Sequence, residues 1–120
     1  MSLTTTTILG TTVHGTASGN YDGSSLDFDS NGTQAVGYYA GLGSIQTVAI
    51  RVTGFQGVIT LQASLNDTLE TAAWFDVSEY IALTPITDYH PESLLGNYVW
   101  IRAKITDFEA GTIDSITIIY

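Results

Sequence analysis

Alternating apolar and polar residues in the middle of the chain predict β-strands. In residues 48–53, Val48, Ile50 and Val52 fall on one face of an extended chain, because successive side chains of a strand point to opposite faces. Residues 58–65 alternate in the same way after the turn-forming sequence at residues 54–57, which has Gly at both ends. Two alternating runs on either side of a short turn predict a β-hairpin.

A second hairpin is predicted in the C-terminal part of the chain. Residues 97–106 alternate strongly, and their core face carries the apolar residues Val99, Ile101, Ala103 and Ile105. Residues 112–120 follow after a turn at residues 107–111, and this last strand becomes apolar on both faces from Ile116 onward. Such a strand either lies in the middle of the chain's own sheet or has one face against another subunit.

The rest of the pattern favours an all-β protein. Residues 73–81 predict a further, less regular strand, and no segment keeps the 3.6-residue period of an amphipathic helix over a useful length. Several short strands separated by Gly and Asn turns predict a single β-sandwich of jelly-roll type.

The first 20 residues differ from the remainder. They are rich in Thr and Gly and carry no charged side chain, which favours extended backbone but supplies little core. We therefore expect residues 1–20 to form an extended N-terminal arm that adds a strand to a neighbour's sheet, or else a frayed terminus, and residues 21–120 to form the sandwich.

The charge balance narrows the class of partner. Twelve acidic and three basic residues give a net charge of -9, which disfavours nucleic acid and anionic membranes, because both require clustered Lys and Arg. Only 12% of the residues are charged, and a surface poor in charge is typical of proteins that contact other proteins. The chain has no Cys, no signal-peptide pattern and no apolar run long enough to span a membrane, so we expect a soluble protein made in a cytoplasm.

Few residues suggest chemistry. Asp27, Asp29, Asn31 and Gly32 match the first half of a calcium-binding loop, but position twelve is Tyr38 rather than Glu, and a simple turn explains the same residues. The two His residues, His14 and His90, do not have a metal-binding spacing, and no nucleophile or phosphate-binding motif is present. We expect no enzyme activity, no cofactor and no metal.

The aromatic and apolar residues near the C-terminus are the candidate interface. Outward-facing side chains of the strand at residues 97–106, together with the final strand that is apolar on both faces, predict a partner interface at Tyr98, Trp100, Arg102, Ile116, Ile118 and Tyr120. The aromatic residues have two other interpretations, as core residues or as a carbohydrate-stacking face. The aromatic residues that could form such a carbohydrate-stacking face are Tyr38, Tyr39, Trp74, Phe75, Tyr80, Tyr98 and Trp100.

Several sequence motifs resemble a recurrent pattern in virion proteins. The motifs are Gly54-Phe55-Gln56-Gly57, then Ser64-Leu65-Asn66-Asp67, a Trp at position 74, Tyr98-Val99-Trp100-Ile101-Arg102, and Ala110-Gly111-Thr112 before the closing strand. Over about residues 45 to 120 the chain is similar to β-sandwich structural proteins of tailed bacteriophages, particularly those of cyanobacterial myoviruses. The family carries no catalytic residues, and its motifs specify turns and strands.

The resemblance implies a function in assembly. It implies a virion structural protein on the particle surface, either a capsid decoration (cement) protein or a component of the tail, baseplate or fibre. The expected partners are other virion proteins and copies of the chain itself, in a homo-oligomer such as a trimer. The alternative is a carbohydrate-binding module for host recognition.

Overall fold

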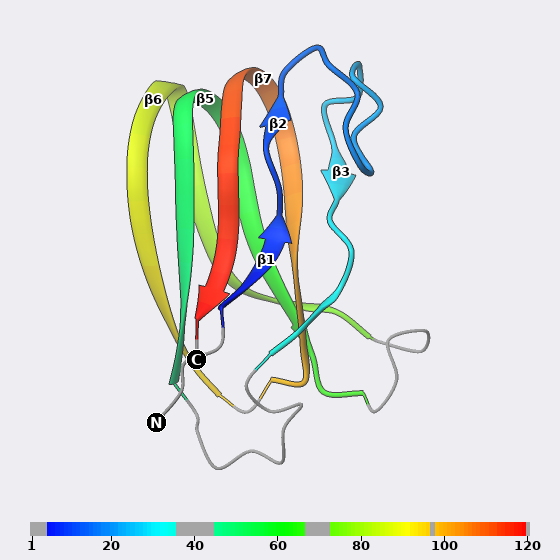
Figure 1. The fold of residues 1–120 in the computed structure, drawn as a ribbon, viewed down its shortest axis with the longest axis vertical. Helices are drawn as coiled ribbons and strands as arrows, with labels where there is room; N and C mark the ends of the chain where they lie inside the picture. The colour runs from blue at the N-terminus through cyan, green and yellow to red at the C-terminus, as the bar shows by residue number, and fades with distance from the viewer. Residues whose placement is uncertain (1–4, 36–44, 67–72, 97, 120) are drawn as a thin grey trace.

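The computed structural model describes residues 5–35, 45–66, 73–96 and 98–119 of the chain (Figure 1). These residues form one antiparallel sheet of seven strands, in which β1, β7, β5 and β6 follow one another and three short strands also pair with β7. The strands are β1 (Thr5–Leu9), β2 (Thr12–Val13), β3 (Phe28–Asp29), β4 (Thr33–Gln34), β5 (Ile45–Ser64), β6 (Phe75–Leu95) and β7 (Trp100–Ile119).

The three long strands fold the sheet over on itself. In Figure 1, β5, β6 and β7 each run up one side of the molecule, arch over the top and descend on the other side. We call the side formed by residues 45–53, 86–95 and 112–119, with β1 and β2, the first layer. The second layer contains residues 58–64, 75–82 and 100–106, with β3 and β4. The protein is therefore all-β and forms a single β-sandwich, as predicted; its jelly-roll connectivity stays a prediction.

The two predicted hairpins are wrong. Residues 48–53 and 58–64 are two halves of one strand, β5, and both halves pair with β6 and β7 rather than with each other. Likewise, residues 100–106 and 112–119 are two halves of β7. At both predicted turns the register shifts and the backbone has positive φ, at Gly54 in β5 and at Asp107 and Gly111 in β7. These irregularities bend the strand instead of reversing it.

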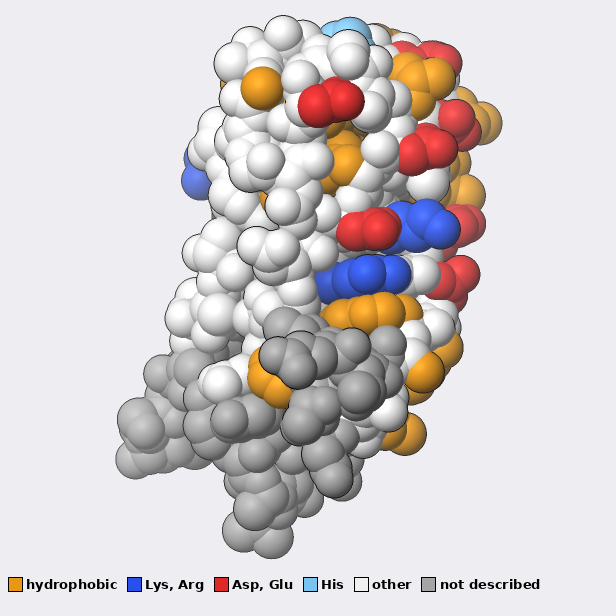
Figure 2. All heavy atoms as spheres, turned by 90° about the vertical axis from the view of Figure 1, so that its right-hand side faces the viewer, with side chains coloured by type: hydrophobic (Ala, Val, Ile, Leu, Met, Phe, Trp, Pro, Cys, Tyr) orange, Lys and Arg blue, Asp and Glu red, His pale blue; other side chains and the backbone are white. Residues whose placement is uncertain are grey.

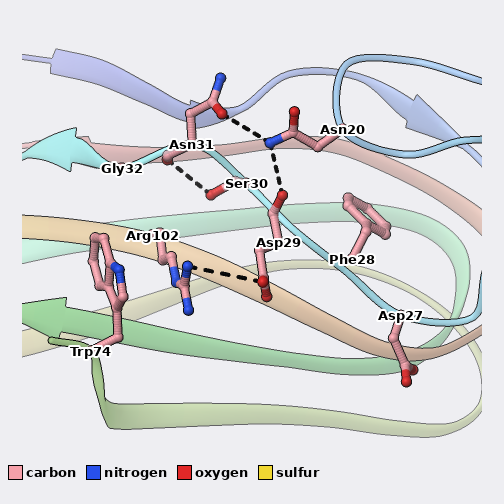
Figure 3. A pocket seen from close by; sticks show the side chains of 9 residues that line it. All are labelled: Asn20, Asp27, Phe28, Asp29, Ser30, Asn31, Gly32, Trp74 and Arg102. Carbon is pink, nitrogen blue, oxygen red and sulfur yellow. Dashed lines mark hydrogen bonds and ion pairs between the residues drawn. The ribbon is translucent and has the colours of Figure 1, made fainter. Parts of the chain in front are cut away.

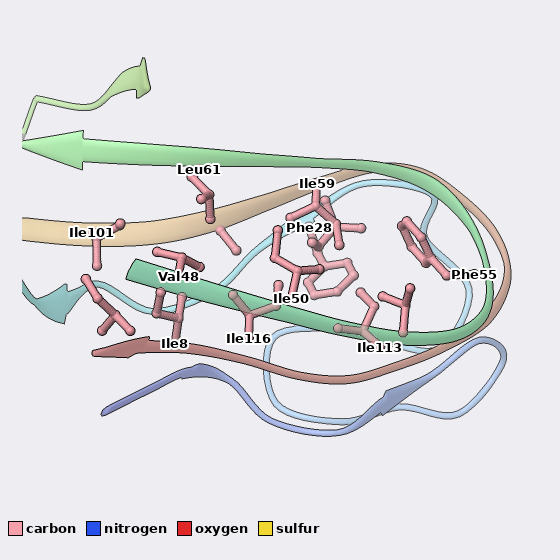
Figure 4. Close-up of a cluster of buried hydrophobic side chains, with 14 of the residues drawn as sticks. Ile8, Phe28, Val48, Ile50, Phe55, Ile59, Leu61, Ile101, Ile113 and Ile116 are labelled. Atoms are coloured by element: carbon pink, nitrogen blue, oxygen red, sulfur yellow. The ribbon is translucent and has the colours of Figure 1, made fainter. Parts of the chain in front are cut away.

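The predicted alternation of faces is confirmed. The apolar side chains of β5 and β7 point into the space between the layers, where Figure 4 shows them meeting. The buried set includes Val48, Ile50, Val52, Ile59, Leu61, Ile101, Ala103, Ile105, Ile113, Ile116 and Ile118, each no more than 1% exposed. Burial of this apolar surface is the main stabilising contribution to the fold.

An aromatic cluster closes the sandwich at the bend. Phe108 is fully buried, and its ring centroid lies 5.2 Å from that of Tyr21, 5.8 Å from Phe55 and 6.1 Å from Phe28. The His14 ring meets Phe108 edge-on at 5.2 Å. A backbone hydrogen bond also holds Phe108 in place: its amide donates to the Leu26 carbonyl at 2.9 Å.

The segment predicted as an arm pairs with the chain's own sheet. Residues Thr5 to Leu9 pair with β7 opposite Ile116 to Ile119, and β2 pairs with Thr112 and Ile113. Ile8 is only 5% exposed and belongs to the core cluster. The first layer therefore contains residues 5–13 of the same chain as an integral part.

Candidate functional site

Five of the six predicted interface residues separate into three groups. Ile116 and Ile118 are fully buried in the core, so a central position in the chain's own sheet accounts for the apolar character of the final strand. Tyr98 and Trp100 are half-buried, and the Trp100 indole N–H donates to the Asn66 carbonyl at 3.1 Å. Tyr120 lies outside the described residues, as do Tyr38 and Tyr39.

Arg102 lies at the centre of a polar network on the outer face of the second layer. Its Nε donates to Gln62 Oε1 at 2.8 Å, and Gln62 Nε2 donates to Asp76 Oδ1 at 2.8 Å. The guanidinium carbon lies 4.5 Å from the ring centre of Trp74, and Nη1 is 3.9 Å from Asp29 Oδ2. Because neighbouring strands place these side chains side by side, the network links β3, β7, β5 and β6.

An open pocket of about 630 Å³ lies beside this network (Figure 3). Its lining is mostly polar and consists of Asn20, Asp27, Phe28, Asp29, Ser30, Asn31, Gly32, Trp74 and Arg102. In Figure 2, acidic and basic side chains gather on the right of the molecule, where the outer face of the second layer lies. Hydrophobic side chains reach the surface beside them.

The residues of the calcium-like motif bind other parts of the protein. Asp27 accepts a hydrogen bond from the Asp107 amide at 3.1 Å, whereas Asp29 faces Arg102 and Asn31 Oδ1 accepts from Asn20 Nδ2 at 2.9 Å. In Figure 3, the Asp27 carboxylate points away from Asp29 and Asn31, so the three do not converge on one point. Among the described residues, no group of three or more His, Asp or Glu side chains could hold a metal ion.

The most distinctive surface feature is the free edge of β6. This strand is the last in the sheet, and within the described residues it pairs with β5 alone (Figure 1). Residues 82–95 of β6 contain no motif that predicted this edge. Of the nine large apolar side chains that are exposed in the described part of the chain, five lie on β6: Phe75, Ile81, Leu83, Tyr89 and Leu95. Leu83, at 81% exposed, is the most accessible of them.

The opposite face of β6 closes the side of the sandwich with polar contacts. Tyr80 in the second layer stacks on His90 in the first, with ring centroids 4.9 Å apart, and its hydroxyl donates to Asp88 Oδ2 at 3.0 Å. His90 Nε2 lies 3.0 Å from Glu92 Oε2. Hydrogen bonds from Ser78 and His90 lower the pKa of Glu92.

Alkaline pH is expected to weaken this closure. Burial, together with the hydrogen bond to the Asp88 carboxylate, raises the pKa of Tyr80 from 10.0 to about 12. The folded state therefore retains the phenol proton more strongly than the unfolded state. The contribution of Tyr80 to the free energy of unfolding is complete below pH 10 and is lost as the pH rises from 10 to about 12. We expect the free energy of unfolding, measured with urea between pH 8 and 12, to fall less steeply in Tyr80→Phe than in the unaltered chain. Identical pH profiles for Tyr80→Phe and the unaltered chain would contradict a raised pKa of Tyr80 in the folded state.

The geometry defines a small β-sandwich whose accessible features, among the described residues, include the outer edge of β6 and the open polar pocket beside Arg102. Comparison of the chain with protein-family models, with characterised proteins and with solved structures finds no match. The described residues also contain no helix that is long and apolar enough to cross a membrane.

Proposed function

We propose that this protein is a structural component of a bacteriophage particle that acts by binding other virion proteins and copies of itself. The observation that carries the proposal is the free edge of β6, which within the described residues pairs with β5 alone and carries five exposed apolar side chains. Exposed apolar surface of this kind is typical of protein interaction sites, and an open strand edge is a template for another strand.

The attribution to a phage particle comes from the sequence motifs. The residues that carry the resemblance have defined structural roles: Gly54 to Gly57 form the bend of β5, and Ala110 to Thr112 lie at the bend of β7. These roles are structural, in keeping with a protein that assembles rather than catalyses. The low content of charged residues also suits a chain with much of its surface in contact with protein.

The proposal is tested by assembly assays on the purified full-length chain. We expect it to form an oligomer in light scattering after gel filtration, or to co-sediment with purified particles of a tailed phage. Leu83→Lys places a charge on the β6 edge and is expected to reduce particle binding at least tenfold. Leu26→Lys makes the same substitution at a 50% exposed residue outside β6 and should have little effect.

A chain that stays monomeric and does not bind particles would refute the proposed function. Equal binding by both Lys variants would instead show that association does not use the β6 edge. Thermal unfolding of each variant checks that neither substitution has unfolded the protein.

Glycan binding is the second candidate, favoured by the open pocket beside Arg102. Its amide, carboxylate and guanidinium groups could hydrogen-bond to sugar hydroxyls, and Trp74 contributes an aromatic ring. Arg102 covers one face of that ring, so only the opposite face remains for a pyranose. A glycan array followed by titration of tryptophan fluorescence tests this candidate, and binding that is retained in Asn20→Ala would exclude the pocket.

A further inference from the structure

The two halves of β6 differ in how well they resist pairing with another strand. The first-layer half contains Pro91, and Pro85 lies near the bend; proline lacks the amide proton that strand pairing uses. This half also turns Asp88, His90 and Glu92 toward the side of the sandwich, where His90 contacts Glu92 and both Asp88 and His90 contact Tyr80. Proline and inward-pointing charged residues are the features by which proteins protect sheet edges.

The second-layer half, residues 75–83, lacks the proline and the inward-pointing charge, and its only interruption of the pairing with β5 is the register shift between Asp76 and Ser78. It contains no proline, and its inward positions include Tyr80 and the buried Ala82 rather than a charged group. Phe75, Ile81 and Leu83 are 40%, 52% and 81% exposed along it. This segment therefore has both the backbone groups and the apolar side chains that strand addition requires.

The charge of the edge indicates what kind of strand would bind. The whole of β6 carries four acidic residues, Asp76, Glu79, Asp88 and Glu92, and no Lys or Arg. Pairing with the β6 of a second copy would bring acidic strands together in a molecule with a net charge of -9. Like charges across a strand pair are destabilising, whereas opposite charges are stabilising.

We propose that residues 75–83 of β6 accept an extended strand from a partner protein in which Lys or Arg alternates with apolar residues. The partner's backbone continues the second layer beyond β6. Its basic side chains lie on the outer face, with their charges near Asp76 and Glu79 and their aliphatic stems against Ile81 and Leu83. Its apolar side chains lie on the inward face, beside Tyr80 and Ala82. This inference rests on the proposed function and specifies the mode of binding and the chemistry of the partner.

The experiment uses the full-length chain and a synthetic nine-residue peptide in which Lys and Val alternate. Fluorescence anisotropy measures binding of the labelled peptide at low and at high salt, and hydrogen exchange locates the protected amides. We expect binding that weakens with salt, with protection in residues 75–83. A peptide with Glu in place of Lys should bind at least tenfold more weakly.

Two controls separate strand addition from general attraction between opposite charges. A Lys-Val peptide methylated at alternate backbone nitrogens keeps its charge but loses one edge of hydrogen-bonding groups; we expect it to lose binding in one of the two methylation patterns. Ile81→Lys should weaken binding at least tenfold relative to Ile45→Lys, because both variants change the net charge equally but Ile45, at 67% exposed, lies on β5.

Each alternative outcome overturns the inference in a recognisable way. Binding that survives both methylation patterns, or is equal in the two Lys variants, shows attraction by charge alone. A homodimer that Ile81→Lys dissociates shows that a second copy occupies the edge. Particle binding that persists in Ile81→Lys overturns this inference but leaves the proposed assembly function standing.

Discussion

Phe108→Ala is expected to lower the free energy of unfolding by about 3–5 kcal/mol, the usual cost of truncating a buried Phe. The ring is fully buried and contacts the rings of His14, Tyr21, Phe28 and Phe55, which come from four separate parts of the chain. Removing it leaves a cavity that these rings cannot fill without moving the bend. A domain of this size has a total stability of roughly 5–15 kcal/mol, so a large part would be lost.

Urea unfolding followed by circular dichroism measures this effect. Phe75→Ala is the matched control, because Phe75 is 40% exposed at the start of β6 and contacts only the Tyr98 ring among the aromatic residues described. We expect the control to lose about 1 kcal/mol or less. A loss of similar size in both variants would mean that the aromatic cluster is not the part of the core that closes the bend.

Gly111→Ala is expected to be the most damaging single-methyl substitution at the bend. Gly111 has a φ of 87°, a conformation that costs other residues about 1–3 kcal/mol. A Cβ there would also collide with the backbone carbonyl of Gly54, which passes Gly111 at the bend where β5 and β7 cross between layers. Relieving that collision requires two strands to separate, so we expect a total loss of roughly 2–6 kcal/mol.

Gly15→Ala separates the two causes. Gly15 has nearly the same φ, 88°, but a Cβ there would meet no atom within 4 Å. Gly15→Ala should therefore show only the cost of the unfavourable backbone conformation. The difference between the two variants in the free energy of unfolding, measured with urea, is then the cost of the collision at the bend. If Gly15→Ala and Gly111→Ala lose equal stability, the close packing at the bend contributes nothing.

The sequence pattern predicted which faces are buried but not how the strands turn. Alternation at Val48, Ile50 and Val52 correctly identified the core face, because every second side chain of an extended strand points to the same face. The same period continues through a bend and through a hairpin, so the pattern could not distinguish them. Phe108 was assigned to a turn for this reason, although a fully buried Phe at its centre is what makes the bend a packed part of the core.

The functional surface was harder to predict, because it depends on pairing between distant segments. Arg102 was correctly placed on the outer face of its strand, and its contacts with Gln62 and Trp74 arise only because β5 lies beside β7 and β6 lies on the other side of β5. The exposed position of Leu83 follows from the place of β6 at the end of the sheet. No local sequence signal reports which of several strands will be the edge strand.

The passage of all three long strands through both layers has a consequence for folding. Neither layer can form as an independent unit, because every long strand would have to be completed in the other layer. The pairing of β5 with β7 joins residues more than 35 positions apart along the whole length of both strands. We therefore expect slow folding, on the scale of milliseconds to seconds, in one cooperative step that assembles both layers together.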